Sequence, residues 1–285
     1  HAENGEILNF LRSECVKKGQ LTPHYHYVSR PPFTEAEAVR RAIYLAGQTD
    51  TPLYIAHMTC REAIAELQKA KGTGQRVSGE TCTHYLTTTK EVLDNPDFNE
   101  AAKFVCSPAL RDREDCEALW QALSDGLLTA VSSDHCGIDV AELKQAGRND
   151  FTQIPNGSPG AGDRLHMVWT EGVCTGKLTR QKFVDVIATQ PAKINGIYPR
   201  KGTLAVGSDA DVVIFDPNYE GTVHLADNPN GVDYNLYEGR RQSGRVETVL
   251  LRGQVVVENA KFVGRYGQGK FIPANMYASG YENRN

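Results

Sequence analysis

The sequence predicts an α/β fold, a sheet or barrel of parallel strands, followed by a smaller domain of β structure. Short apolar runs alternate with helical patterns over the first 190 residues, which is typical of parallel α/β arrangements. Two of these runs end abruptly in a chemically active side chain, His57 and Asp134. After Pro191, short β-branched runs separated by turn residues replace the helices, which indicates the second domain.

The first hundred residues predict helices and strands in turn. Apolar residues at helical spacing over 7–15 end in Lys17-Lys18-Gly19, a helix stop. A loop that contains His24 and His26 follows, because two prolines come directly after it. Thr34 opens a capping box with Glu37, so a helix begins there. The remaining elements expected in this part are that helix to about residue 48, strand 53–57, a helix over about 61–71 and strand 76–82.

The middle of the chain continues the alternation and then breaks it with a long loop. We expect a strand fragment at 103–106, a helix from Asp112 and a strand at 129–133. The loop 134–163 is unusually long, and loops of this length inside a compact domain are usually functional. Two helices over about 163–174 and 179–189 follow, the second capped by Thr179.

The last third predicts a small β domain. A run at 212–215 and an alternating stretch over 246–257 are expected as strands, and Glu258-Asn259 turns the chain back onto 261–263. We therefore divide the chain into a first domain over 1–200, a second over 201–263 and a tail over 264–285.

Composition excludes several classes of function. A hydrophobic content of 40% is that of a globular protein, and the net charge of −4 favours neither nucleic acid nor an anionic membrane surface. No apolar run is long enough to span a membrane. The seven cysteines are scattered and form no disulfide framework or paired zinc motif, which favours a reducing, cytoplasmic location.

Three residues at predicted element ends are candidates for a metal site. His57 and Asp134 end apolar runs, and His1 stands directly before a helical pattern. Two histidines and an aspartate suit a metal site of the hydrolytic kind. Taken singly, an aspartate after a strand is more often a turn or capping residue, and a lone histidine is more often a core residue. The hypothesis therefore depends on the three residues together.

Several motifs carry a resemblance to a known family. The chain resembles the cyclic amidohydrolases at His1-Ala-Glu-Asn-Gly5, Ala56-His57-Met-Thr-Cys60, Gly79-Glu-Thr-Cys82, Cys106-Ser107-Pro108 and Ser133-Asp134-His135-Cys136. Three further stretches resemble the dihydropyrimidinase/D-hydantoinase branch: 150–157, 207–211 and 232–239.

The resemblance implies a (β/α)8 barrel of the TIM type with a small β-sandwich domain and two zinc ions. His1 and His57 would be ligands of one zinc, and Asp134 would bind the other and transfer protons. Main-chain groups at Ser107 and Asn156 would hold a small cyclic amide. The implied reaction is the opening of a dihydropyrimidine or hydantoin ring to an N-carbamoyl amino acid, in a homotetramer. The resemblance gives His135 no role.

The chain also departs from the family pattern. The first-strand His-x-His, the metal-bridging carboxylated lysine and a substrate-facing tyrosine of the family have no counterpart here. We therefore expect a C-terminal portion of the enzyme, without about four of the eight barrel strands, which is inactive alone. His24 and His26 are not that His-x-His, because they follow a helix and precede Ser-Arg-Pro-Pro rather than a barrel strand. We expect them to be loop residues and not ligands.

Two alternatives remain open. A non-catalytic assembly protein on the same fold would be expected to lose metal ligands, so the presence of His57 and Asp134 argues against it. An allantoinase-type hydrolase is disfavoured by Ile154-Pro-Asn-Gly and by the stretch 232–239.

Overall fold

The structure, a computed structural model, describes residues 1–275 and separates them into two compact units. The first unit consists of His1–Arg164 together with Val223–Gly239, and the second of Leu165–Thr222 together with the described residues from Arg240 to Asn275. The α/β fold with a separate antiparallel sheet confirms the predicted fold class. The domain limits expected near residues 200 and 263 stay a prediction, and most of the expected tail, residues 276–285, lies outside the described residues.

A parallel sheet of three strands forms the centre of the first unit. Its strands are β1 (Leu53–Ile55), β2 (Val77–Cys82) and β3 (Ala130–Ser132), in the order β1-β2-β3. The register aligns Leu53 with Val77 and Glu80 with Ala130. Because the strands are parallel, their carboxyl ends lie at one edge of the sheet.

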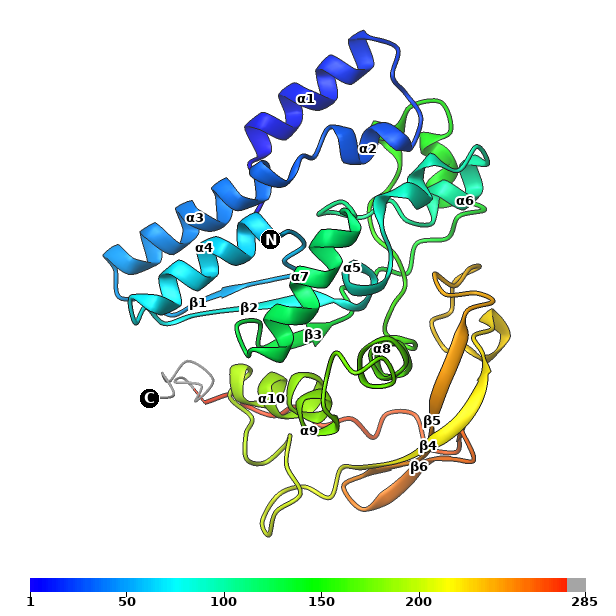
Figure 1. The fold of residues 1–285 in the computed structure, drawn as a ribbon. Coiled ribbons are helices and arrows are strands. Elements are labelled where there is room, and N and C mark those ends of the chain that lie inside the picture. Colours follow the sequence, from blue (N-terminus) through cyan, green and yellow to red (C-terminus); the bar gives the residue numbers. More distant parts are fainter. Residues whose placement is uncertain (276–285) are drawn as a thin grey trace. The chain divides into compact units, whose positions relative to one another are not determined.

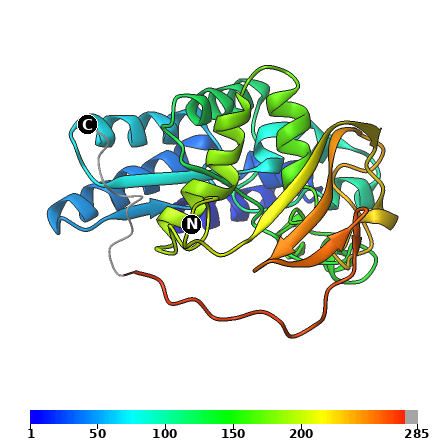
Figure 2. The same ribbon diagram turned by 90° about the horizontal axis from the view of Figure 1, so that it is seen from below.

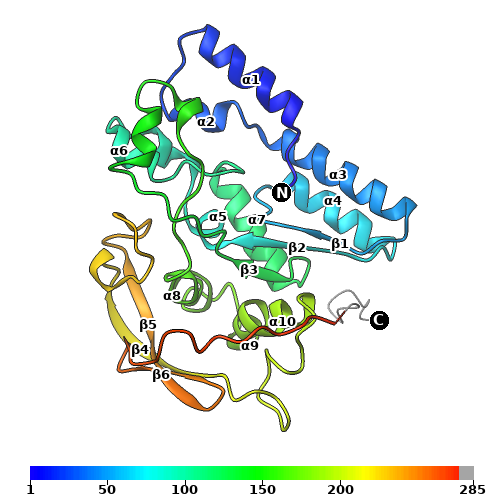
Figure 3. The same cartoon turned by 180° about the vertical axis from the view of Figure 1, so that it is seen from behind.

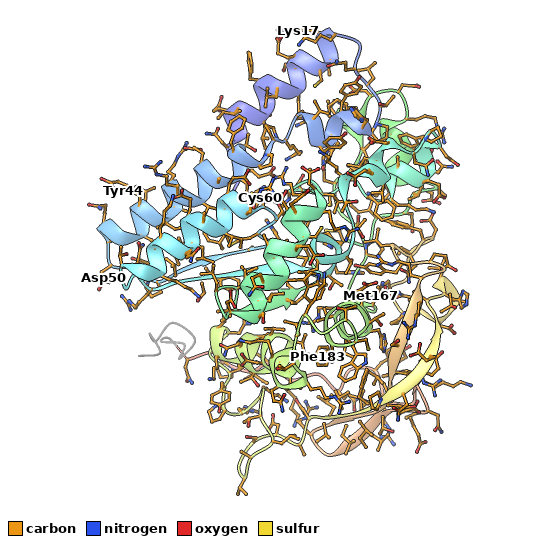
Figure 4. The ribbon with its side chains drawn as sticks, in the orientation of Figure 1. Lys17, Tyr44, Asp50, Cys60, Met167 and Phe183 are labelled. Atoms are coloured by element: carbon orange, nitrogen blue, oxygen red, sulfur yellow. The ribbon has the colours of Figure 1, made fainter. Side chains whose placement is uncertain are left out.

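Three helices lie side by side along one face of this sheet (Figures 1 and 3). They are α3 (Pro32–Gln48), α4 (Arg61–Gly72) and α7 (Arg113–Ser124), close to the expected ranges. Each buries one apolar stripe, such as Ile64 and Leu67 on α4. The opposite face of each helix meets solvent. On α3, for example, the exposed side chain of Tyr44 points outward (Figure 4).

Further elements surround this sheet. The longest is α1 (Gly5–Lys17), which begins where the Asn4 side chain accepts a hydrogen bond from the Ile7 amide. The others are α2 (His24–Val28), α5 (Thr83–Thr87), α6 (Phe98–Ala102) and the 3-10 turns η1 (Lys90–Asp94), η2 (Leu143–Gly147), η3 (Phe151–Gln153) and η6 (Leu225–Asp227).

Two expectations for this unit are wrong. His24 and His26 lie on α2 rather than in a loop, because the prolines at 31 and 32 follow this short helix and open the next one. The segment 103–106 is not a strand. The carbonyl of Val105 accepts a hydrogen bond from the Gly157 amide, so a loop rather than a sheet satisfies this backbone.

The second unit begins with helices around an aromatic cluster. These are α8 (Arg164–Val168), the π-turn η4 (Trp169–Val173), α9 (Arg180–Val184), the π-turn η5 (Asp185–Thr189) and α10 (Gln190–Ile194). The Thr179 hydroxyl accepts from the Lys182 amide at 3.1 Å, so it caps α9 as expected. Trp169 packs edge-on against Phe183 and Phe215, with ring centroids 5.3 and 4.8 Å away. Phe183 and Met167 are marked on these helices in Figure 4.

An antiparallel sheet completes the second unit, drawn from yellow to orange in Figure 2. Its strands are β4 (Val212–Thr222), β5 (Arg241–Leu251), β6 (Gln254–Glu258) and β7 (Lys261–Phe262), in that order. The expected single stretch over 246–257 is a hairpin, because Arg252 and Gly253 both take positive φ and reverse the chain. The described residues form one sheet here, and the second sheet of a sandwich stays a prediction.

Two further observations on the described residues concern membrane-spanning helices and the cysteines. Within residues 1–275, no helix combines the length and apolarity that crossing a membrane requires. All seven cysteines lie in this range and are free thiols.

Candidate active site

The carboxyl edge of the parallel sheet carries a repeated pattern of polar side chains. His57 stands two residues beyond β1, His84 two residues beyond β2 and Asp134 two residues beyond β3. His57 and Asp134 have φ of 38° and 42°, a left-handed conformation that is uncommon outside glycine. Such strain clusters at functional sites, so this edge is the candidate site.

His57 is a buried imidazole with a free nitrogen. Its Nδ1 has no hydrogen-bond partner within residues 1–275. Its ring meets that of His1 edge-on, with centroids 4.9 Å apart. Burial lowers the pKa of His57, and the negative charge of Asp134 opposes that shift. A neutral imidazole with an unused nitrogen is the form that binds a metal ion.

The other imidazole, His1, is oriented by a buried carboxylate. Its Nε2 lies 2.8 Å from Oε2 of Glu3, and Nη1 of Arg30 donates to the same oxygen at 2.9 Å. Burial would raise the pKa of Glu3, but the hydrogen bond from His1 and the charge of Arg30 outweigh it and lower that pKa to about 2. The ionised carboxylate therefore fixes the orientation of the His1 ring.

A buried ion pair connects the segments that carry the two histidines. Glu35 accepts hydrogen bonds from the amide and the hydroxyl of Thr59, two residues after His57. Nη2 of Arg111 donates to Glu35 at 3.1 Å. Nη1 of Arg111 donates to the carbonyl of Arg30, and the Arg30 side chain in turn donates to Glu3. Breaking a buried pair of this kind is strongly destabilising. The positions of His1 and His57 are thus fixed by one shared framework.

Ser107 and Asn156, the two residues that the family resemblance places at the substrate, lie together. The Ser107 hydroxyl donates to Oδ1 of Asn156 at 3.0 Å. Within residues 1–275, the amide and the carbonyl of Ser107 form no hydrogen bond, and those of Asn156 form none either. The pair therefore offers two free main-chain donors and two free acceptors.

A loop binds the Ser107 segment to the Asp134 segment. The amide of Gly157 donates to the Val105 carbonyl at 3.0 Å, and the amide of Cys136 donates to the Ser158 carbonyl at 3.0 Å. Gly157 has φ of 132°, and a Cβ there would stand 2.5 Å from Cβ of Cys136. Only glycine allows the loop to pass this close.

His24 and His26, which we did not expect to bind metal, each have another partner. Nδ1 of His24 lies 2.6 Å from Oδ1 of Asp94, near the protein surface. Nε2 of the buried His26 donates to the Cys106 carbonyl at 2.8 Å. Residues 1–275 contain no group of three or more His, Cys, Asp or Glu side chains placed to hold a metal ion by themselves.

His84 is a residue of this edge that sequence reasoning missed. It is buried, and its Nε2 has no partner within residues 1–275. Burial, with a smaller contribution from His57, lowers its pKa to about 3. Its position two residues after a predicted strand, like that of His57, was the available signal.

Comparison with known proteins identifies the family. The model of the amidohydrolase family matches residues 31–256. The chain belongs to the amidohydrolase family. It is 47% identical over 277 residues to a D-hydantoinase of Ralstonia pickettii, covering 97% of this chain and 60% of that protein. It is 39% identical over 272 residues to a dihydropyrimidinase of Arabidopsis thaliana, covering 95% of this chain and 51% of that protein.

A solved structure agrees with the sequence relationship. The crystal structure of a dihydropyrimidinase from Brevibacillus agri superposes with a TM-score of 0.95 at 43% identity, covering 100% of this chain and 60% of that one. The predicted resemblance is therefore confirmed. This amidohydrolase chain spans about 60% of the length of the D-hydantoinase that it matches.

The donor atoms at the edge fit part of a metal centre. Amidohydrolases are typically metal-dependent. The unused Nδ1 of His57, the adjacent imidazole of His1 and the carboxylate of Asp134 are donors that zinc accepts. A complete centre needs further ligands, since residues 1–275 supply no full set.

Proposed function

We propose that this chain is part of a metal-dependent hydrolase that opens the ring of a cyclic amide. The substrate would be a dihydropyrimidine or a hydantoin, and the product an N-carbamoyl amino acid. The observation that carries the proposal is His57, whose free, buried Nδ1 lies beside His1 at the sheet edge shared with Asp134. The D-hydantoinases and dihydropyrimidinases among the relatives support this choice of substrate.

Two zinc ions would be held at this edge, His1 and His57 binding one and Asp134 the other. The remaining ligands would come from segments outside these 285 residues. When bound, zinc supplies Lewis acidity and lowers the pKa of water at the site. Burial of His57 and the contact of His1 with Glu3 would prepare the two imidazoles for this role, because they hold the rings in place before metal binds.

Asp134 would be the general base and acid. Its carboxylate is exposed at the sheet edge, where an attacking water can reach it. It would accept the proton of that water and return it to the ring nitrogen as the C–N bond breaks. The constrained backbone at φ of 42° fixes the direction from which the carboxylate acts.

The free main-chain groups of Ser107 and Asn156 would hold the –NH–CO– edge of the ring. Such an edge needs an acceptor for its N–H and a donor for its C=O, and the backbone supplies both. The hydrogen bond between the two side chains keeps these groups at a fixed separation.

The proposal is tested on a full-length protein, meaning one of the relatives' length that contains this chain. Dihydrouracil, hydantoin and allantoin are offered separately, and bound zinc is measured by elemental analysis. We expect turnover of dihydrouracil or hydantoin and about two zinc ions per subunit. Turnover of allantoin alone would support an allantoinase, and a metal-free, inactive protein would support a non-catalytic assembly protein.

We further propose that the protein assembles as a homotetramer in the cytoplasm. Large apolar side chains are exposed on α1 and α3, among them Phe10, Tyr44 and Leu45, and the cysteines are free. Light scattering on the full-length protein measures the assembly, and a monomer would contradict the proposal.

A further inference from the structure

Lys144 is a buried cation outside the residues discussed so far. It lies on η2 (Leu143–Gly147) with 0% of its surface exposed. Its Nζ donates to the carbonyls of Gly157 at 2.7 Å and Val105 at 3.2 Å. Within residues 1–275 it makes no ion pair with a carboxylate, although lysine is almost never fully buried without one. Burial lowers its pKa to about 8.

The two carbonyls belong to the two segments that would hold the substrate. Val105 precedes Ser107 by two residues, and Gly157 directly follows Asn156. The Val105 carbonyl also accepts a hydrogen bond from the Gly157 amide, so Lys144 reinforces a contact that already joins the two segments. One ammonium group therefore fixes the positions of both segments that would hold the substrate.

The effect on Asn156 follows from peptide geometry. In the trans peptide that joins Asn156 to Gly157, the N–H and C=O groups point in opposite directions. The N–H points at Val105, so the Asn156 carbonyl points away from it. Lys144 holds the carbonyl that accepts this N–H and also the next carbonyl along the chain, and so fixes the plane of the peptide.

We propose that Lys144 is the positioning residue that aims the Asn156 carbonyl and the Ser107 main chain at the substrate. The inference rests on the proposed function, in which these main-chain groups bind the substrate. Lys144 acts through the Val105 and Gly157 carbonyls and does not touch the substrate.

The support for Lys144 is itself rigid. The backbone amide of Lys144 donates to the Asp139 carbonyl, and the side chain of Asp233 accepts from the amides of Val140 and Ala141. A Cβ at Gly147 would stand 2.1 Å from Cγ1 of Ile154, so η2 packs directly against the chain that leads to Asn156. An apolar side chain at 144 would fill the space but leave the Gly157 carbonyl unsatisfied.

A matched control is available at Lys71, another lysine whose Nζ donates to two carbonyls, those of Leu127 at 2.8 Å and Gly126 at 3.4 Å. Burial lowers its pKa too, and it lies at the end of α4, away from Ser107 and Asn156. Lys71 is half-buried, whereas Lys144 is fully buried. If lysines that donate to backbone carbonyls matter here only for folding, Lys71→Met and Lys144→Met will affect catalysis alike.

The experiment measures kcat, KM and zinc content for hydantoin and dihydrouracil in the full-length protein. We expect Lys144→Met to raise KM at least about tenfold, with a smaller change in kcat and unchanged zinc content, because it removes binding rather than chemistry. Lys71→Met should leave KM unchanged. Lys144→Gln, whose amide can still donate to one carbonyl, should give an intermediate KM.

Several outcomes would overturn the inference. A zinc-replete Lys144→Met protein with the wild-type KM would do so, as would equal rises in KM at positions 144 and 71. If Lys144→Met does not fold, a wild-type KM in Lys144→Gln decides against it. A wild-type protein that opens none of the three rings would overturn the proposed function and this inference together, whereas an active wild type with insensitive variants would overturn this inference alone.

Discussion

The hydroxyl of Ser107 donates a 3.0 Å hydrogen bond to the side-chain oxygen of Asn156, which lies 49 residues further along the chain. The bond occupies the serine side chain and leaves the main chain of both residues free within residues 1–275. We therefore propose that the Ser107 side chain is a structural link and that its free backbone groups bind the substrate.

The first prediction follows from this bond. Ser107→Ala in the full-length protein should be mild, with kcat and KM changed by less than about tenfold, because one exposed hydrogen bond contributes about 1 kcal/mol. Steady-state kinetics with zinc analysis measures the effect. Abolition of kcat with fold and zinc intact would make the hydroxyl catalytic and the main-chain hypothesis wrong.

The second prediction concerns Asp134. Asp134→Asn keeps the size of the side chain and removes the base, so kcat should fall at least about a hundredfold in the full-length protein. Asp97→Asn, at the cap of α6, is the control and should leave kcat unchanged. A near-normal kcat in Asp134→Asn would remove this residue from the mechanism.

The strands and the site edge were predictable for a local reason. Apolar runs that end in His57 and Asp134 predict buried parallel strands, and functional residues commonly lie at the carboxyl ends of such strands. The same reasoning failed at 103–106, an apolar run whose backbone bonds to the loop at Gly157. Sequence shows that a segment is buried but not which partner satisfies its backbone.

The supporting residues could not be predicted in this way. Glu35 and Arg111 stand 76 positions apart and meet only after folding. Lys144 sits in a polar loop, where a lysine would be expected in solvent, and its burial depends on carbonyls from two distant segments. His84 had a local signal, its position after β2, which becomes informative once the strand end is known.

The third prediction concerns the 285-residue chain alone. It holds candidate ligands for only part of a binuclear site, and residues 1–275 contain no complete metal-binding group. We expect weak zinc binding by calorimetry and no turnover of hydantoin or dihydrouracil. Ring opening by the purified chain, with no partner present, would contradict this expectation.

The last prediction concerns acid stability and rests on His26. Burial lowers the pKa of His26 to about 3, while the positive charge of Arg30 acts in the same direction and the bond to the Cys106 carbonyl opposes it. In the unfolded chain the pKa of His26 returns to about 6.5. Between pH 6.5 and pH 3 the unfolded state therefore binds a proton that the folded state does not bind. The stabilising contribution is complete above pH 6.5 and is lost progressively as the pH falls toward 3.

The size of the effect follows from the same two values. At pH 5 the loss should be about 2 kcal/mol in the free energy of unfolding, taking 1.36 kcal/mol per pKa unit. His26→Gln can still donate to the Cys106 carbonyl but does not titrate, so its stability should fall less between pH 7 and pH 5 than that of the wild type. Denaturant unfolding at the two pH values measures both slopes. Equal slopes would show that His26 already accepts a proton in the folded protein, and that the carbonyl of Cys106 does not hold it neutral.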